Sequence, residues 1–153
     1  MNRRIVTLCL LLAAAVVVHA AVSQPPAEIM GISLGMARDD AHKRLKSLGS
    51  LEKETRKRQE VWALKDQRVS HLLVGYDTGF RVRYVTAIAR TGGTRIRYEE
   101  FADVKTAQRT NTQGNYKFTW EVPAQRDQPG YVAIAHGRDP QYLESYSIKK
   151  VDR

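Results

Sequence analysis

Four arginines recur at alternate positions on two extended stretches of the chain. Arg81 and Arg83 fall in the strand-like segment 80–89, and Arg95 and Arg97 follow a Thr-Gly-Gly-Thr break. Alternate residues of a strand point to the same face, so each pair predicts two neighbouring guanidinium groups. Guanidinium grips phosphate or carboxylate in two-pronged fashion, which makes the four a candidate site for an anionic partner. The alternative is a solvated outer sheet face whose arginines protect an edge from aggregation.

No spacing of histidines in the chain predicts catalysis or a metal site. His42, His71 and His136 lie on a predicted helix, strand and turn, and none has a His, Asp or Glu partner at metal-ligand spacing. The pair Ser70-His71 lacks the strand–elbow–helix setting of a nucleophilic serine. We therefore predict neither a metal nor a cofactor.

Three carboxylates near residue 100 offer one further kind of chemistry. Glu99, Glu100 and Asp103 would suit a small carboxylate-dependent hydrolase if they converged on one point. Acids near a helix start more often complement the helix dipole. We predict a protein that is not an enzyme, with the hydrolase as an alternative.

One amphipathic helix, predicted over residues 38–48, is the element around which the rest must fold. Ala41, Leu45 and Leu48 form one apolar stripe, and Gly49 is the expected residue just past the helix end. The preceding Ala37 offers no side-chain cap, which gives up about 1 kcal/mol. We expect the stripe to be buried against Trp62 and the strands that follow.

Most of the remaining chain alternates as strands do. Strands are predicted over 61–64, 69–76, 80–89, 116–122, 131–135 and 142–149, whereas 51–59 is expected to be an exposed connection and 109–115 a turn-rich segment. No repeat of fixed period is evident. The predicted fold class is α+β: one main N-terminal helix packed on an antiparallel sheet of about five to six strands, with a short helical turn near 98–107.

The first residues predict export from the cytoplasm. Asn2-Arg3-Arg4 is a cationic start, residues 5–18 are almost entirely apolar, and Val18-His19-Ala20 suits a signal peptidase. We expect a signal peptide over 1–20, with cleavage as late as 23, a flexible mature N-terminus over 21–30, and a single domain over 31–153. The only cysteine, Cys9, lies too early in the apolar run to carry a lipid. This favours a secreted or periplasmic protein with no transmembrane span after cleavage.

The chain is basic, with 25 Lys and Arg against 16 Asp and Glu and a formal charge of +9. Loss of the signal peptide with Arg3 and Arg4 would lower this charge by two. A basic exported domain is biased toward acidic proteins or anionic envelope components. Export argues against a nucleic-acid partner.

A resemblance to a known group rests on the first half of the expected mature chain. Gly35-Met36 at the helix start, Leu48-Gly49 at its end, a Trp-containing strand and Val74-Gly75-Tyr76-Asp77 before a hairpin resemble the β-lactamase-inhibitor-protein-like group, which includes the small SmpA-type envelope lipoproteins. Ala37 departs from the Ser or Thr usual there, and the lipid-bearing cysteine of the lipoproteins is absent. The resemblance implies a non-enzymatic module that binds a protein or an envelope component. A purely structural envelope protein is a further alternative.

Overall fold

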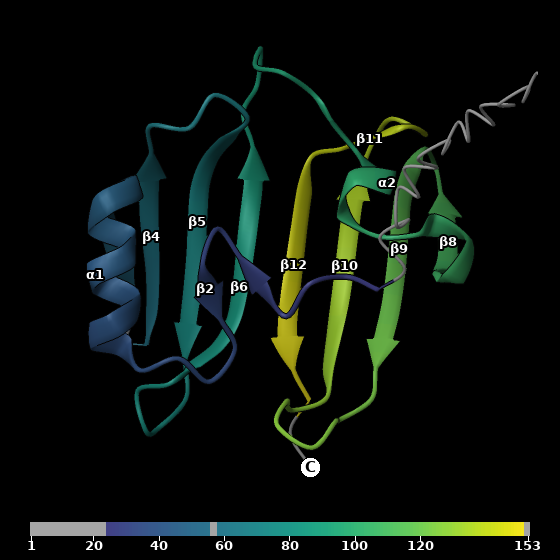
Figure 1. Cartoon of the computed structure of the whole chain (residues 1–153). Helices are drawn as coiled ribbons and strands as arrows, with labels where there is room; N and C mark the ends of the chain where they lie inside the picture. The colour runs from purple at the N-terminus through teal and green to yellow at the C-terminus, as the bar shows by residue number, and fades with distance from the viewer. Residues whose placement is uncertain (1–23, 56–57, 152–153) are drawn as a thin grey trace, which may run out of the picture.

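One antiparallel sheet organises the chain in the computed structural model, which describes residues 24–55 and 58–151 (Figure 1). Its eight strands pair in the order β3-β4-β5-β6-β12-β10-β9-β8. The bounds are β3 Gly49–Thr55, β4 Gln59–Leu64, β5 Val69–Tyr76, β6 Val82–Ala89, β8 Gln108–Thr112, β9 Asn115–Val122, β10 Tyr131–Gly137 and β12 Ser145–Lys150. The predicted signal peptide lies outside the described residues.

The remaining elements are one helix of 11 residues and several short pieces. They are β1 Glu28–Ile29, β2 Ile32–Ser33, α1 Arg38–Leu48, β7 Ile96–Arg97, α2 Tyr98–Phe101, the 3₁₀ turn η1 Val104–Thr106, and β11 Tyr142–Leu143. β1 pairs with β2, and β7 pairs with β11. Within 24–30, Pro25 and Ile29 are buried, and the Tyr131 hydroxyl donates a hydrogen bond to the Pro25 carbonyl.

The predicted fold class is wrong, because the described chain is mostly β and its sheet has eight strands. The segment expected to be an exposed connection, 51–59, contains most of β3, and the segment expected to be turn-rich, 109–115, contains most of β8. Both are edge strands of the sheet. Every residue of β8 is exposed and β3 has no buried residue, so neither carries the alternation by which an inner strand is recognised.

The sheet consists of two halves with the same order of elements. In the first half α1 precedes the consecutive strands β3 to β6, and in the second half α2 and η1 precede β8, β9, β10 and β12. The last strands of the two halves, β6 and β12, pair with each other, which leaves the first strands β3 and β8 at the edges. This is the arrangement of two units related by a two-fold rotation about the centre of the sheet. The sequence gives no sign of it, because the helical part shrinks from 11 residues in α1 to four in α2.

The helix α1 packs its apolar stripe onto the first half of the sheet. Ala41 and Leu45 are fully buried in the same core as Trp62, and Leu48 is half-buried against it. Ala37 makes no side-chain cap, whereas Asp39 and Asp40 lie in the first turn, where the helix dipole favours acids. The helix therefore depends on burial more than on its ends.

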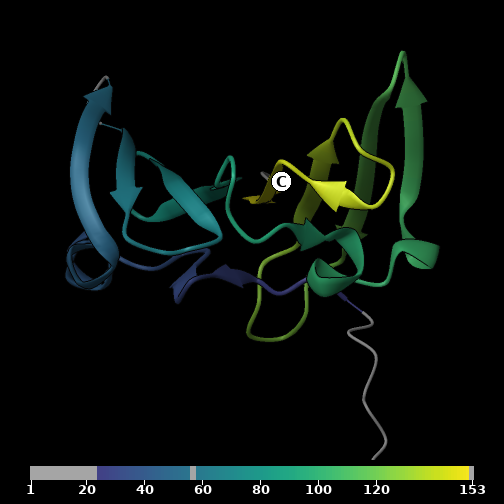
Figure 2. The same ribbon diagram turned by 90° about the horizontal axis from the view of Figure 1, so that it is seen from above.

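The two faces of the sheet differ in cover. The helix α1, the β1–β2 hairpin and α2 all lie on one face, while the other face carries no element among the described residues (Figure 2). The edge strands, blue β3 and green β8, bend toward this uncovered side, so the uncovered face is concave. A sheet with one covered face normally turns polar side chains to the other.

Candidate functional site

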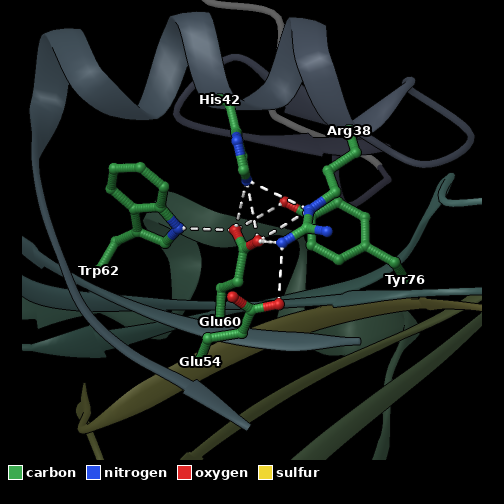
Figure 3. Close-up of polar contacts among 6 residues, drawn as sticks. All are labelled: Arg38, His42, Glu54, Glu60, Trp62 and Tyr76. Carbon is green, nitrogen blue, oxygen red and sulfur yellow. Dashed lines mark hydrogen bonds and ion pairs between the residues drawn. The ribbon is translucent and has the colours of Figure 1, made fainter. Parts of the chain in front are cut away.

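A carboxylate is fully buried between α1 and the sheet (Figure 3). Glu60 lies on β4, where Glu60, Trp62 and Leu64 alternate inward and are all buried. Arg38 and His42 are one helical turn apart on α1, so both side chains descend from the helix toward the same point. Tyr76 reaches it from the end of β5. Side chains from α1, β4 and β5 thus converge on the Glu60 carboxylate.

Each oxygen of Glu60 accepts several hydrogen bonds. Arg38 donates to Oε1 from Nε at 2.9 Å and from Nη2 at 2.6 Å. The indole Nε1 of Trp62 and the hydroxyl of Tyr76 both donate to Oε2 at 3.0 Å. His42 Nε2 lies 2.8 Å from Oε1 and 2.9 Å from Oε2. Arg38 also bonds Glu54 on β3 at 3.0 Å, which ties the helix to the edge strand as well.

These contacts shift the pKa values of the cluster so that Glu60 stays ionised and Tyr76 stays protonated. Burial alone raises the pKa of Glu60, but the hydrogen bonds from Trp62, His42 and Arg38 outweigh it and hold that pKa below its ordinary 4.5. Burial and the negative charge of Glu60 raise the pKa of the Tyr76 hydroxyl well above its usual range. Glu60 is therefore a carboxylate, and Tyr76 a hydrogen-bond donor, throughout the neutral range.

The cluster joins α1 to the sheet and is not placed to act on a substrate. Glu60 has no exposed surface, and donors already occupy both of its oxygens. A buried charge that is completely satisfied in this way fixes the position of α1 over β4 and β5. We interpret it as a brace between helix and sheet.

Acid is expected to weaken this brace. Because the pKa of Glu60 is lower in the folded chain than its ordinary 4.5, the unfolded chain binds more protons in this range, and stability falls as pH drops. We expect the free energy of unfolding to be nearly constant from pH 7 to about pH 5 and to fall steeply below about pH 4.5. Urea titrations at a series of pH values measure this. The Glu60→Gln variant should be less stable at pH 7 and should lose less of its remaining stability in acid; an unchanged slope would contradict the assignment.

Sequence reasoning missed this cluster although two signals point to it. Glu60 shares the inward parity of Trp62 and Leu64 on a strand, which places an acid at a core position. Arg38 and His42 stand four residues apart on the same side of the helix. A buried acid requires partners, and these two are the nearest candidates.

The four arginines proposed as an anion site lie as two separate pairs. Arg81 directly precedes β6 and Arg83 lies at its start, whereas Arg95 and Arg97 belong to the segment around β7, beyond the far end of β6. The strand β7 pairs with β11 and not with β6. The sequence therefore indicated extended segments for the arginines, but it could not show that the two pairs lie apart.

These arginines make contacts within the protein. Arg81 Nη1 donates to the Gly35 carbonyl at 3.1 Å. Arg95 Nη2 pairs with Asp139 at 2.5 Å, and its guanidinium stacks 3.8 Å from the Tyr142 ring centre. Arg97 lies over the same ring at 5.7 Å. A common anion site for all four stays a prediction.

The carboxylates near residue 100 do not form a pair. Glu100 accepts from the Arg97 backbone at 3.0 Å and from Arg68 Nη2 at 2.6 Å, while Asp103 caps η1 through the Lys105 backbone. Backbone hydrogen bonding and the Arg68 charge hold the pKa of Glu100 below its usual range. Glu100 and Asp103 serve local structure, and Glu99 is exposed on α2, so the geometry gives the hydrolase alternative no support.

Ser70 and His71 also come together without a catalytic geometry. His71 Nδ1 lies 3.0 Å from Ser70 Oγ, and its Nε2 lies 3.2 Å from Glu52 on β3. The Ser70 hydroxyl, however, donates to the Ile88 carbonyl at 3.3 Å, so its proton is directed to the backbone. We assign this group no nucleophilic role.

The uncovered concave face presents apolar side chains at its centre. The strand register places Val61, Leu73, Thr86, Ser147, Ile134 and Thr119 in one row across six strands. Ile88 lies in the row on one side, and Tyr84 and Val132 in the row on the other. All nine are half-buried although no element covers them. We call the six apolar members, Val61, Leu73, Tyr84, Ile88, Val132 and Ile134, the central patch.

Basic groups outnumber acids around the central patch. Lys149 and Lys117 stand on the same face of β12 and β9, and Lys53 is paired opposite Val61 on β3. Glu121, opposite Val132, and Glu52, which pairs with His71 in the row of Ile88, are acids on that face. Such a surface is suited to a partner with an apolar centre and an acidic margin.

Comparisons with known proteins identify no relative. Neither protein-family models, nor curated proteins, nor solved structures match the chain. The resemblance to the β-lactamase-inhibitor-protein-like group therefore stays a prediction. In the described part of the chain no helix has the length and apolar character needed to cross a membrane, and no three His, Cys, Asp or Glu side chains gather as metal ligands would.

Proposed function

We propose that this protein is a secreted or periplasmic binding module without catalytic activity, and that it docks a protein partner on the concave face of its sheet. The observation that carries the proposal is the central patch. A solvent-facing sheet surface with no partner would be expected to alternate to polar residues, and this one keeps Leu73, Ile134 and Ile88 at its centre.

The form of the face favours a protein over a small molecule. The patch extends over strands from both halves of the sheet and is a broad concave surface, as protein interfaces with an apolar core and a polar rim are. The surrounding lysines favour an acidic partner and would speed its approach. The broad apolar centre also distinguishes this face from a site that would bind envelope anions by charge alone.

A charge placed in the central patch should abolish docking. We expect Ile134→Lys to weaken partner binding about 30-fold, because an apolar anchor at the centre of an interface is worth about 2 kcal/mol. The partner is first isolated on the immobilised domain from an envelope extract, and its dissociation constant is then measured by calorimetry for each variant. Circular dichroism checks that the half-buried site tolerates the lysine.

The matched control adds the same charge at the edge of the same face. Thr110 is exposed on β8, and Thr110→Lys should leave the affinity within a factor of about two. Equal weakening by both variants would show a general charge effect and reject the central patch. Binding to anionic phospholipid vesicles that survives Ile134→Lys, with no protein captured, would replace the proposal by the envelope-component alternative.

A further inference from the structure

A cavity of about 540 Å³ opens on the covered side of the sheet, between the β1–β2 hairpin and α2. Its walls come from both halves of the molecule: Ile29 and Met30 from the hairpin, Ile96 and Phe101 from the second half, and Tyr146 from β12. The volume lies within the range of small-molecule sites, and the walls are mainly apolar, as in such sites. It is separated from the concave face by the sheet itself.

The charges at this cavity oppose the charge of the whole protein. Glu28, Asp66 and Glu100 line it together with one cation, Arg68. Arg68 is offset by Glu100 through their 2.6 Å ion pair. Glu28 makes no ion pair among the described residues, and Asp66 binds only backbone N–H groups through Oδ1. An excess of negative charge therefore remains in a chain of formal charge +9.

Two nearby arginines form no ion pair with these acids. Arg90 directs its guanidinium to the backbone carbonyls of Asp66 and Leu64 at 2.9 and 2.8 Å. Arg44 donates to the Met30 carbonyl at 3.0 Å. Neither side chain lines the cavity. The carboxylates of Glu28 and Asp66 are thus without a side-chain cation partner among the described residues.

The Tyr146 hydroxyl supplies a polar group that the protein leaves unused. The ring packs against Phe101 with centroids 4.9 Å apart, but no described residue forms a hydrogen bond with the hydroxyl. Burial raises the pKa of the Tyr146 hydroxyl, so the phenol stays neutral at pH 7. Arg68, Asp66 and Glu100 line the same cavity as Tyr146. A neutral phenol oxygen can accept a hydrogen bond from an ammonium group.

We propose that this cavity binds a small organic cation, an ammonium group on an aromatic or aliphatic body. The ammonium donates to the Tyr146 hydroxyl and faces Glu28 and Asp66, while the body lies against Phe101, Ile96 and Met30. The Phe101 and Tyr146 rings add a favourable environment for a cation. The site lies on the other side of the sheet from the docking face, so it does not depend on the proposed function.

Three probes of one shape test the charge requirement. Phenethylammonium, the neutral 2-phenylethanol and the anion phenylacetate are titrated into the full mature protein, and NMR shifts of Tyr146 and Phe101 report occupancy. We expect phenethylammonium to bind with a dissociation constant of about 1 mM, the range for a ligand of this size, and at least tenfold more tightly than the alcohol. Equal binding of the alcohol, tighter binding of the anion, or no shift with any probe would overturn the proposal.

Variants assign the binding to named groups. Glu28→Gln should weaken phenethylammonium binding about threefold or more without affecting the alcohol, and Tyr146→Phe should weaken it while keeping the ring. The control is Glu99→Gln, which removes an exposed acid of α2 that does not line the cavity. A loss with Glu99→Gln equal to that with Glu28→Gln would mean that only overall charge matters and would reject the site.

Discussion

Replacing Glu60 by alanine is expected to lower the free energy of unfolding by about 3–5 kcal/mol, the cost of breaking a buried ion pair by removing one partner. Arg38 would lose two hydrogen bonds, and the donors on Trp62 and Tyr76 would face an apolar gap. Their desolvation is no longer repaid once the acceptor is gone. Urea unfolding followed by tryptophan fluorescence measures the loss, since the Trp62 indole binds Glu60 directly.

Two further variants separate the brace from charge in general. Glu54 also bonds Arg38, at 3.0 Å, but it is exposed, so Glu54→Ala should cost less than about 1 kcal/mol. Replacing both charges, Arg38→Met with Glu60→Leu, should recover part of the loss, because no uncompensated charge is left. A Glu60→Ala variant as stable as Glu54→Ala would contradict the brace.

The inner elements could be predicted because burial leaves a period in the sequence. The helix stripe of Ala41 and Leu45 recurs at helical spacing, and both residues are fully buried. The strand β5 begins and ends where the residue pattern predicted, at Val69 and Tyr76. In each case one side of the element packs against the core, and this burial requires apolar residues at regular positions along the element.

The edge strands could not be predicted because no such constraint acts on them. β8, with the sequence Gln-Arg-Thr-Asn-Thr, is exposed at every position and is held by backbone pairing to β9. Backbone pairing does not constrain which side chains β8 carries, so it leaves no periodic pattern in the sequence of this strand. β3 contains in addition a bulge between Leu51 and Lys53, which breaks any alternation. Their omission produced the smaller sheet of the predicted fold.

For the candidate sites as well, local residue spacing could be predicted from the sequence, but the relative positions of distant segments could not. The spacing of Arg95 and Arg97 is local, but the position of their strand beside β11 depends on chain segments more than 40 residues away. The central patch likewise depends on the order of the strands, because Leu73 and Ile134 come from different halves. Strand order is set by the global pairing, which single-strand patterns do not encode.

Gly49 does follow the helix end, as predicted, but the reason for glycine at this position differs from the predicted one. The helix pattern predicted glycine as the residue past the helix end, where a left-handed backbone favours it. In the structure Gly49 has a φ of −175°, which is extended backbone. It is also the first residue of β3 and pairs with Leu64 on β4, so helix and strand join without a linker. Glycine is needed here for close approach and not for its φ.

Alanine at position 49 is therefore expected to cost about 3 kcal/mol, the upper part of the range for forced overpacking. A Cβ on Gly49 would stand 1.9 Å from the carbonyl oxygen of Ala63 and 2.8 Å from its carbon, and these are backbone atoms that cannot rotate away. Relief would require α1 or β4 to shift, and the Glu60 brace opposes that shift. Thermal and urea unfolding of Gly49→Ala measure the loss.

The control is Gly35→Ala, which isolates the effect of φ from that of space. Gly35 has a φ of +83° and no atom within 4 Å of the added carbon, so its cost is backbone strain alone, about 1–2 kcal/mol. If glycine at 49 serves close approach, Gly49→Ala loses more stability than Gly35→Ala although its φ is unstrained. The reverse order would mean that the helix–strand junction can move apart, and the direct connection of α1 to β3 would then not be what positions Arg38 and His42 over Glu60.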